Sequence, residues 1–219
     1  NLYECLTSKE ELLIELEGLF QGFGIEIPNE RKLILEQAEE GISRHGFNNI
    51  TLEMIAKAAG MNRGTIYKHF SDKYELLECC IDYQFSKIKD IMSMVYNANQ
   101  ENPEDFIRNY LENYRNFLNH SYDSSVFTEA WSHLNYRRKI KKYTFELQEH
   151  LRGLFLQCLN TGISQGIFKK NLNLNAITDF MLFLYSGMAF FLNKEEEREK
   201  ISRESVDTMV DAILQMIRV

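Results

Sequence analysis

The chain has 219 residues, of which 44% are hydrophobic and 26% charged, and this is the composition of an ordinary globular protein. Only 2 prolines and 11 glycines occur over this length, which favours long helices and argues against a sandwich or barrel with frequent turns. No stretch approaches the roughly 18 uncharged apolar residues of a transmembrane span, so we expect no membrane association. The 4 cysteines include no C-x-x-C pair, which predicts reduced thiols and a cytoplasmic location.

Charge is distributed unevenly along the chain. The formal net charge of −7 argues, taken alone, against a nucleic-acid partner. Residues 1–28 carry six acidic side chains and one basic one, whereas residues 54–71 carry Lys57, Arg63 and Lys68 and no acid. A local cationic strip can bind DNA even on an acidic body, because charges more than about 8 Å away are screened at physiological salt.

The first half of the chain is predicted to be helical. Apolar stripes at helical spacing predict a helix over 8–21 and a second over 29–46. Thr51 is expected to cap a short helix that ends before Gly60, and another short helix follows Asn62 to about residue 70. Ser71 is the expected cap of a longer helix over 72–93.

The second half continues the helical pattern. Further helices are expected at 106–117, 124–135, 136–161, 174–192 and 203–218, with a break at 162–173. No strand is predicted, so the fold class is all-α. We divide the chain into an N-terminal extension helix (1–28), a three-helix helix-turn-helix domain (29–77), and a larger helical domain for ligand binding and dimerisation (78–219).

The segment from Thr51 to Lys73 carries the chemistry. Small residues on the first short helix and Gly60 in the turn allow two helices to cross closely, which is the layout of a helix-turn-helix. The second helix would enter a major groove with a slender polar tip. There Arg63 can reach guanine O6 and N7, and Thr65 can contact a base edge or a thymine methyl.

This segment resembles the DNA-binding domain of the TetR family of one-component transcriptional regulators. The residues that carry the resemblance are Gly46-Phe47, Ile55-Ala56, Ala59-Gly60, Gly64-Thr65-Ile66-Tyr67, His69-Phe70 and Lys73-Tyr74-Glu75-Leu76-Leu77. A fainter similarity occurs at residues 162–168, which are like the late helix break of that family.

The resemblance implies a homodimer that places two recognition helices in successive major grooves of an operator and releases DNA when a small-molecule effector binds. It implies phosphate contacts from Thr51, Tyr67, His69 and Lys73. It places Asn62, Arg63 and Thr65 at the bases, with Lys68 at a base or a phosphate. Gly64 also belongs to the predicted DNA-binding set, because the backbone can approach DNA where there is no side chain. The family often has serine or threonine where this chain has Asn62.

The larger domain is rich in aromatic residues, most of which must pack a core. Some of them can also line a cavity for a hydrophobic or aromatic ligand. The candidates for ligand contact are Tyr110, Tyr114, Trp131, His133, Phe155 and Phe183. The basic run at 137–142 is interpreted as a solvated face, with contact to an anionic ligand or to phosphate as the alternative.

The last two predicted helices have wide apolar faces, and two helices from each subunit would form a four-helix bundle. The residues predicted for this dimer interface are Phe180, Leu184, Met188, Phe191, Met209, Ile213 and Ile217.

The sequence has no Walker loop, no H-E-x-x-H and no G-x-G-x-x-G, and its one G-x-S-x-G, at residues 162–166, follows a predicted helix and not a strand. No histidine pair has metal-ligand spacing, and neither a cofactor nor a metal is expected. The leading hypothesis is a DNA-binding regulator, most simply a repressor. The alternatives are a ligand-binding module without DNA binding and an enzyme of the same fold.

Overall fold

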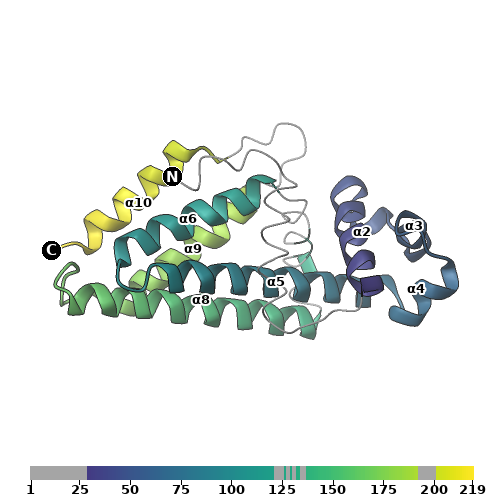
Figure 1. Ribbon diagram of the computed structural model, residues 1–219, viewed down its shortest axis with the longest axis horizontal. Helices are drawn as coiled ribbons and strands as arrows, with labels where there is room; N and C mark the ends of the chain where they lie inside the picture. Colours follow the sequence, from purple (N-terminus) through teal and green to yellow (C-terminus); the bar gives the residue numbers. More distant parts are fainter. Residues whose placement is uncertain (1–28, 121–125, 127–128, 130–131, 134–136, 192–200) are drawn as a thin grey trace.

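The computed structural model describes residues 29–120, 126, 129, 132–133, 137–191 and 201–219. Over these residues the chain forms eight α-helices and one 3-10 turn, and its extended pairing is limited to an isolated antiparallel bridge between Phe168 and Arg218. The expected all-α fold is therefore confirmed (Figure 1). The predicted helix at 8–21 and most of the one at 124–135 lie outside the described residues.

Three helices form a small unit at one end of the molecule (Figure 1). They are α2 (Asn29–His45), α3 (Leu52–Ala58) and α4 (Arg63–His69), with the 3-10 turn η1 (Phe47–Asn49) between the first two. The side chains of Ile34, Phe47, Ile66 and Phe70 are almost completely buried between them. This shared apolar core makes the three short elements one unit.

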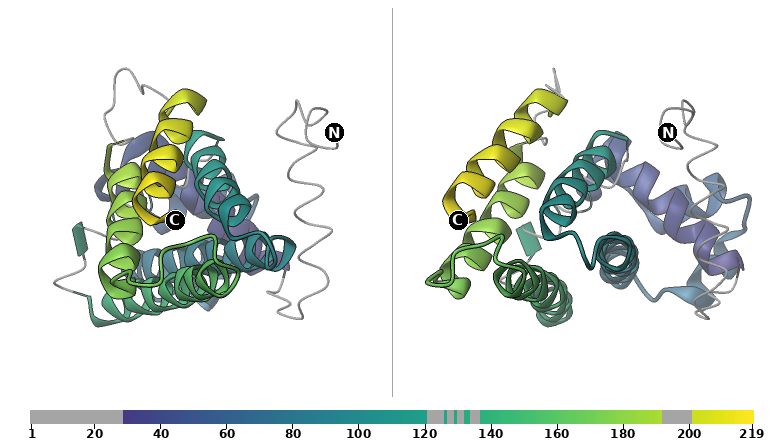
Figure 2. Two further views of the ribbon diagram at one scale, coloured as in Figure 1. Left: turned by 90° about the vertical axis from the view of Figure 1, so that its left-hand side faces the viewer. Right: turned by 60° about the vertical axis from the view of Figure 1, so that its left-hand side comes forward.

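The helix α5 (Lys73–Ala98) starts in the small unit and runs without a break into the larger one (Figure 1). It lies side by side with α8 (Arg138–Ser164), while α6 (Pro103–His120), α9 (Leu174–Phe191) and α10 (Arg203–Ile217) lie on one side of this pair (Figure 2). The sequence-based boundary at residue 77 thus falls inside a continuous helix and marks no linker.

Side-chain caps fix the starts of the short helices. The hydroxyl oxygen of Thr51 accepts a hydrogen bond from the backbone N–H of Met54 at 3.2 Å. The amide oxygen of Asn62 likewise accepts from the backbone N–H of Thr65 at 2.9 Å. Each cap satisfies one of the donors that the first turn of a helix leaves unpaired. The predicted cap at Thr51 is confirmed.

The cap of α5 lies one residue later than predicted. Asp72, and not Ser71, is the cap, because its carboxylate accepts from the backbone N–H groups of Tyr74 and Glu75, both at 2.8 Å. Ser71 instead donates from its N–H and its hydroxyl to the Glu75 carboxylate, at 2.8 and 2.6 Å. Serine and aspartate are both good caps, and the carboxylate adds a favourable charge at the helix N-terminus.

The end of α8 is set by close packing against Gly162. The N–H groups of Ile167 and Phe168 both donate to the carbonyl oxygen of Gly162, at 2.9 and 3.0 Å. A Cβ atom on Gly162 would lie only 2.1 Å from Cδ2 of Phe168, so the fully buried ring occupies the space that a side chain would need. The predicted break after residue 161 is confirmed, with the last helical residue at Ser164.

Candidate nucleic-acid interface

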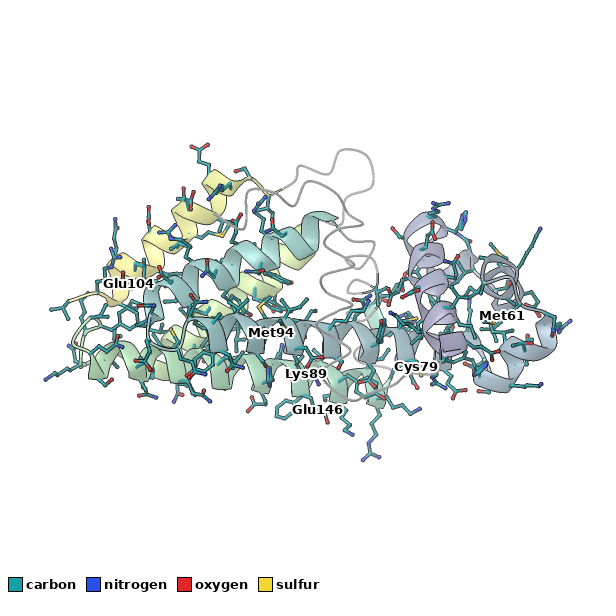
Figure 3. All side chains as sticks on the ribbon, in the orientation of Figure 1. Met61, Cys79, Lys89, Met94, Glu104 and Glu146 are labelled. Atoms are coloured by element: carbon teal, nitrogen blue, oxygen red, sulfur yellow. The ribbon has the colours of Figure 1, made fainter. Side chains whose placement is uncertain are left out.

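The helices α3 and α4 form a helix-turn-helix at the outer end of the small unit. Gly60 has φ +67°, a conformation that L side chains rarely adopt, and it allows the chain to reverse between the helices. The N–H of Met61, labelled in Figure 3, donates to the carbonyl oxygen of Ala56 at 2.8 Å. Ile55 and Ile66 bury their side chains in the angle between the helices. The tip of α4 is thereby held on a packed support.

The first turn of α4 presents polar groups to solvent. The Arg63 side chain is 74% exposed. Gly64 is exposed, and a Cβ atom added there would lie 3.2 Å from the Asn62 amide oxygen. Because this oxygen already caps the helix, a contact from Asn62 to DNA would have to come from its NH2 group. Thr65, one helical turn after the cap, is half-buried.

An acidic residue that the sequence analysis did not select joins this surface. Glu53 Oε1 lies 3.2 Å from Nε of Arg63 and accepts a hydrogen bond from the Tyr67 hydroxyl at 3.0 Å. The Arg63 guanidinium carbon also lies 5.4 Å from the centroid of the Tyr67 ring. A hydrogen bond from its own backbone, the Tyr67 hydroxyl and the Arg63 charge together hold the pKa of Glu53 below its usual value.

The last turn of α4 is basic. Lys68 is exposed, and His69 Nε2 lies 3.3 Å from a carboxylate oxygen of Glu30 at the start of α2. This pair links the end of α4 to the beginning of the small unit. Glu30 is a second acidic partner that periodicity in sequence does not reveal, because 39 residues separate it from His69.

Lys73 holds the η1 turn onto the start of α5. Its Nζ donates to the carbonyl oxygens of Phe47 and Asn48 at 3.3 and 3.1 Å, and lies 4.8 Å from the centroid of the Phe47 ring. A cation is disfavoured in the first turn of a helix, and the two carbonyls offset that cost. The ammonium group is therefore engaged by the protein itself.

The candidate ligand residue His133 lies elsewhere than predicted. Its ring packs edge-on against Phe47 and Tyr74, with centroid distances of 5.4 and 6.0 Å. It therefore contacts the small unit and the start of α5, and not the aromatic cluster of the larger unit. Sequence proximity to Trp131 suggested a shared cavity, whereas the ring of His133 itself packs onto Phe47 and Tyr74.

The basic run at 137–142 contributes to the same junction. Glu78 on α5 is 8% exposed, and its carboxylate lies 3.1 Å from Nζ of Lys139 and 3.7 Å from Nη1 of Arg137. The Arg137 guanidinium carbon also lies 4.1 Å from the centroid of the Tyr74 ring. Two members of the run thus neutralise a buried carboxylate, which corrects the interpretation as a purely solvated face. Cys79, the residue that follows Glu78 on α5, is labelled in Figure 3 and shows where this junction lies.

The larger unit encloses a cluster of aromatic rings. Tyr110 and Tyr114 are completely buried, and Phe155 is 2% exposed. The rings of Tyr110 and Phe155 have centroids 4.5 Å apart, and Tyr114 stacks on Tyr185 at 3.9 Å. Burial raises the pKa of all three tyrosine hydroxyls well above the ordinary value. Three of the six predicted ligand residues are therefore brought together, with Tyr185 as an additional member.

A small apolar hollow adjoins this cluster. It has room for about one water molecule, and part of it opens to solvent. Its lining residues are Ile107, Leu111, Phe155, Met181, Leu184 and Ile213. The hollow is wholly apolar and smaller than the pocket of a typical drug-sized ligand.

The remaining two candidates for ligand contact do not join the cluster. Trp131 lies outside the described residues. Phe183 is 73% exposed, so its prediction as a pocket residue was wrong. The helix α9 turns Met181, Leu182 and Tyr185 into the core, which leaves the intervening Phe183 on the opposite face.

The residues predicted for a dimer interface divide into covered and accessible ones. Met188, Ile213 and Ile217 are 4%, 1% and 0% exposed, so they pack the core of their own chain and were wrong as surface contacts. The apolar faces of α9 and α10 are wide because they cover α6 and α8 first. Leu184 and Met209 are half-buried, and the side chain of Phe191 lies outside the described residues.

An apolar surface nevertheless remains on these two helices. Phe180 is 38% exposed on α9, next to the more exposed Phe183 one turn away, and Met216 is 42% exposed on α10. Exposed aromatic side chains on one helix face are typical of protein contact sites.

The described part of the chain holds no group of three or more histidine, cysteine or acidic side chains that could bind a metal ion. Within the same residues, no helix has the length and apolar character needed to cross a membrane.

Comparison with known proteins gives matches in both units. Residues 34–80 match the family model described as bacterial regulatory proteins, tetR family. The chain is 22% identical to the HTH-type transcriptional repressor KstR2 of Mycobacterium tuberculosis over 161 residues. This aligned region covers 71% of this chain and 78% of that protein. Over 52 residues, or 24% of this chain and 25% of the relative, it is 42% identical to the HTH-type transcriptional regulator TtgR of Pseudomonas putida.

Solved structures share the fold. A TetR transcription regulator from Haloarcula marismortui superposes with a TM-score of 0.77 at 17% identity, covering 88% of this chain and all of that one. The structure of the ketosteroid transcriptional regulator KstR2 of Mycobacterium tuberculosis superposes with a TM-score of 0.62, also at 17% identity, covering 89% of this chain and 97% of that one.

Proposed function

We propose that this chain is a dimeric repressor of the TetR family that a small apolar or aromatic ligand releases from a palindromic operator, and the match of residues 34–80 to the tetR family model and the similarity to KstR2 support this. The observation that carries the proposal is the exposed tip of α4, where the Arg63 side chain extends from a helix-turn-helix with a packed support. Such a regulator works where the DNA is, in the cytoplasm.

Base reading is assigned to the first turn of α4. Arg63 makes two parallel hydrogen bonds to a guanine through its terminal nitrogens, and Thr65 contacts a neighbouring base edge. Gly64 lets the backbone approach the groove, since it adds no side chain on the exposed side. Asn62 contributes from its NH2 group, and Lys68 contacts a base or a phosphate.

Phosphate contacts are assigned to residues around this tip. Thr51 offers its hydroxyl group at the start of α3, and Tyr67, His69 and Lys73 offer donors on both sides of the groove. All four side chains already have a protein partner: the Thr51 hydroxyl oxygen accepts from the N–H of Met54, Tyr67 donates to Glu53, His69 lies beside Glu30, and Lys73 donates to backbone carbonyls. Binding to DNA exchanges or shares these partners.

Dimerisation is assigned to the outer faces of α9 and α10. The exposed Phe180, Phe183 and Met216 support this surface, and each would be covered by the same helices of a second copy related by a two-fold axis. The two recognition helices then read half-sites about 34–36 Å apart.

The ligand is assigned to the region of the buried aromatic cluster and the adjoining apolar hollow. Tyr110, Tyr114 and Phe155 supply an apolar wall with hydroxyl groups as polar handles. One structural neighbour, KstR2, is a ketosteroid transcriptional regulator, and because a steroid skeleton is apolar, this likeness supports an apolar ligand class. Because the hollow is small, the ligand must open it, and this opening is the conformational change that we propose.

The junction around Glu78 transmits the change. When α8 moves relative to α5, the contacts of Arg137 and Lys139 to Glu78 and Tyr74 move the small unit with it. Ligand and DNA then favour different arrangements, and each lowers the affinity for the other by the same factor.

The proposal is tested by selection from random duplexes. The purified chain is mixed with randomised DNA, the bound fraction is amplified, and the affinity for the selected sequence is measured over a range of salt concentrations. A palindromic consensus with a steep negative salt slope is expected. No enrichment by an intact dimer would refute DNA binding and favour a ligand-binding module. The test is repeated without residues 1–28, because their acidic charge can itself repel DNA.

A further inference from the structure

We propose that Glu53 sets the DNA selectivity of the recognition helix, by holding Arg63 in position for base contact and by repelling DNA on which that contact is lost. This inference rests on the proposed function as an operator-binding regulator. It adds a specificity-determining residue of negative charge to a surface whose other assigned contacts are neutral or cationic.

The geometry that carries the inference is a contact between three side chains across the helix-turn-helix. One carboxylate oxygen of Glu53, on the first turn of α3, meets Arg63 and Tyr67 on α4 at 3.2 and 3.0 Å. All three side chains are substantially exposed, at 43% for Glu53, 74% for Arg63 and 43% for Tyr67. The carboxylate therefore lies on the same exposed surface as Arg63, which we assign to DNA contact, and not in the core of the unit.

The orientation of the guanidinium matters for the reading of a base. Arg63 approaches Glu53 through Nε, which leaves both terminal nitrogens available for an end-on bidentate contact with guanine. Arg63 can therefore keep its contact with Glu53 while its two terminal nitrogens bind guanine. A charge-assisted contact of this kind reduces the number of orientations that the long side chain samples, and so lowers the entropy cost of base contact.

The same carboxylate acts against non-specific binding. On DNA without the matching guanine, Arg63 would turn to a phosphate and leave Glu53, whose charge would then face the phosphates without a partner. Specific DNA keeps the contact between Glu53 and Arg63, and non-specific DNA breaks it.

A purely local role for Glu53 makes a different prediction. An acidic side chain in the first turn of α3 also stabilises the helix through its dipole. That role would change the melting temperature and leave the preference of the protein for one sequence over another unaltered. The ratio of operator affinity to non-specific affinity therefore separates the two roles.

The experiment compares the wild-type chain with Glu53→Gln on the selected operator and on a scrambled duplex of equal length, by fluorescence anisotropy. Two unit charges about 6 Å apart in water interact with an energy that corresponds to about a threefold change in affinity. Glu53→Gln should therefore bind the scrambled duplex about threefold more tightly, with the operator affinity unchanged or lower. The selectivity ratio should fall by at least that factor.

Two further variants make the test specific. Glu30→Gln removes the same charge from the same unit, but its contact is to His69, so it should shift both duplexes by the same factor and leave the ratio unchanged. In an Arg63→Ala background, Glu53→Gln should no longer alter the ratio, because the partner through which it acts is gone. Melting curves of each variant verify that the chain is folded.

The outcomes distinguish the inference from the function on which it rests. A selective wild-type protein whose selectivity is unaltered by Glu53→Gln overturns the inference and leaves the proposed function standing. An equal fall of the ratio in Glu30→Gln, or in the Arg63→Ala background, also overturns it. A wild-type protein without any sequence preference overturns the proposed function itself.

Discussion

The two glycines within α8 provide a test in which one substitution has opposite effects at two positions. At Gly162, a Cβ atom would lie 2.1, 2.3 and 2.7 Å from three ring atoms of Phe168, whereas at Gly153 no atom beyond the helix itself lies within 4 Å. Ordinary contact starts near 3.4 Å, so alanine at 162 forces the ring to retreat by more than 1 Å. Alanine at 153 displaces nothing.

The magnitudes follow from two opposing effects. Alanine in place of glycine inside a helix stabilises the folded chain by about 1 kcal/mol. Overpacking of a core costs about 1–3 kcal/mol, and Phe168 is 0% exposed with its N–H bonded to the Gly162 carbonyl, so the ring cannot turn to solvent. We expect Gly153→Ala to raise the free energy of unfolding by about 1 kcal/mol and Gly162→Ala to lower it by up to about 2 kcal/mol, the difference between the two effects.

Thermal unfolding followed by circular dichroism measures both effects. For a chain of this length 1 kcal/mol corresponds to about 2–4 °C, so the two variants should melt on opposite sides of the wild type. Protein concentration is kept constant, because a dimer melts at a temperature that depends on it. Phe168→Leu combined with Gly162→Ala should cost less than the two single changes together. If both glycine variants shifted the melting temperature in the same direction, the close packing of Gly162 on Phe168 would be refuted.

Three further predictions concern DNA, assembly and pH. Arg63→Ala should weaken operator binding by about 1–3 kcal/mol and relax one base position in a repeated duplex selection, and an unaltered consensus would remove Arg63 from the base-reading set. Phe183→Glu should yield a monomer in sedimentation with the melting behaviour of a folded chain, because its ring is exposed; a dimer of wild-type strength would exclude this face. The Arg218 side chain lowers the pKa of Glu104, so the stabilisation from this pair is present above pH 4.5 and is lost as the pH falls below it. The difference in melting temperature between wild type and Glu104→Gln should accordingly shrink as the pH falls below 4.5.

Local signals explain why the helix-turn-helix could be predicted from the sequence. The caps at Thr51 and Asn62, and the glycine at 60, act within three or four residues of their own position, so the pattern of residues contains the whole interaction. Ser71 shows that such signals can misplace a helix cap by one residue. Two capping residues stand side by side there, and only the structure shows that the carboxylate of Asp72 accepts the helix N–H groups.

Partners from distant parts of the sequence could not be predicted in this way. Glu53 stands one residue before the acid-free stretch at 54–71, and the turn at Gly60 carries it across to Arg63. The signal was present as a single acidic residue at the edge of a basic strip. The position of His133 against Phe47 carries no such signal, because it depends on how two units pack together.

The apolar helices near the end of the chain show a different limit. Periodicity indicates that α9 and α10 have wide apolar faces, but it does not say which neighbour covers which part. Tyr185 and Phe183 are two residues apart on the same helix, and the rings of α6 cover the first while the second stays exposed. Burial of this kind is decided by tertiary packing.

Because α5 is one continuous helix, a small tilt at one of its ends becomes a large displacement at the other. Its 26 residues make a rod about 39 Å long at a rise of 1.5 Å per residue. A tilt of about 5° at one end moves the other end by roughly 3.4 Å, which is about the rise of a single base pair in a duplex. In the proposed dimer the two rods swing together, so an angular change too small to disturb the packing of either unit is enough to place both recognition helices out of register with the DNA.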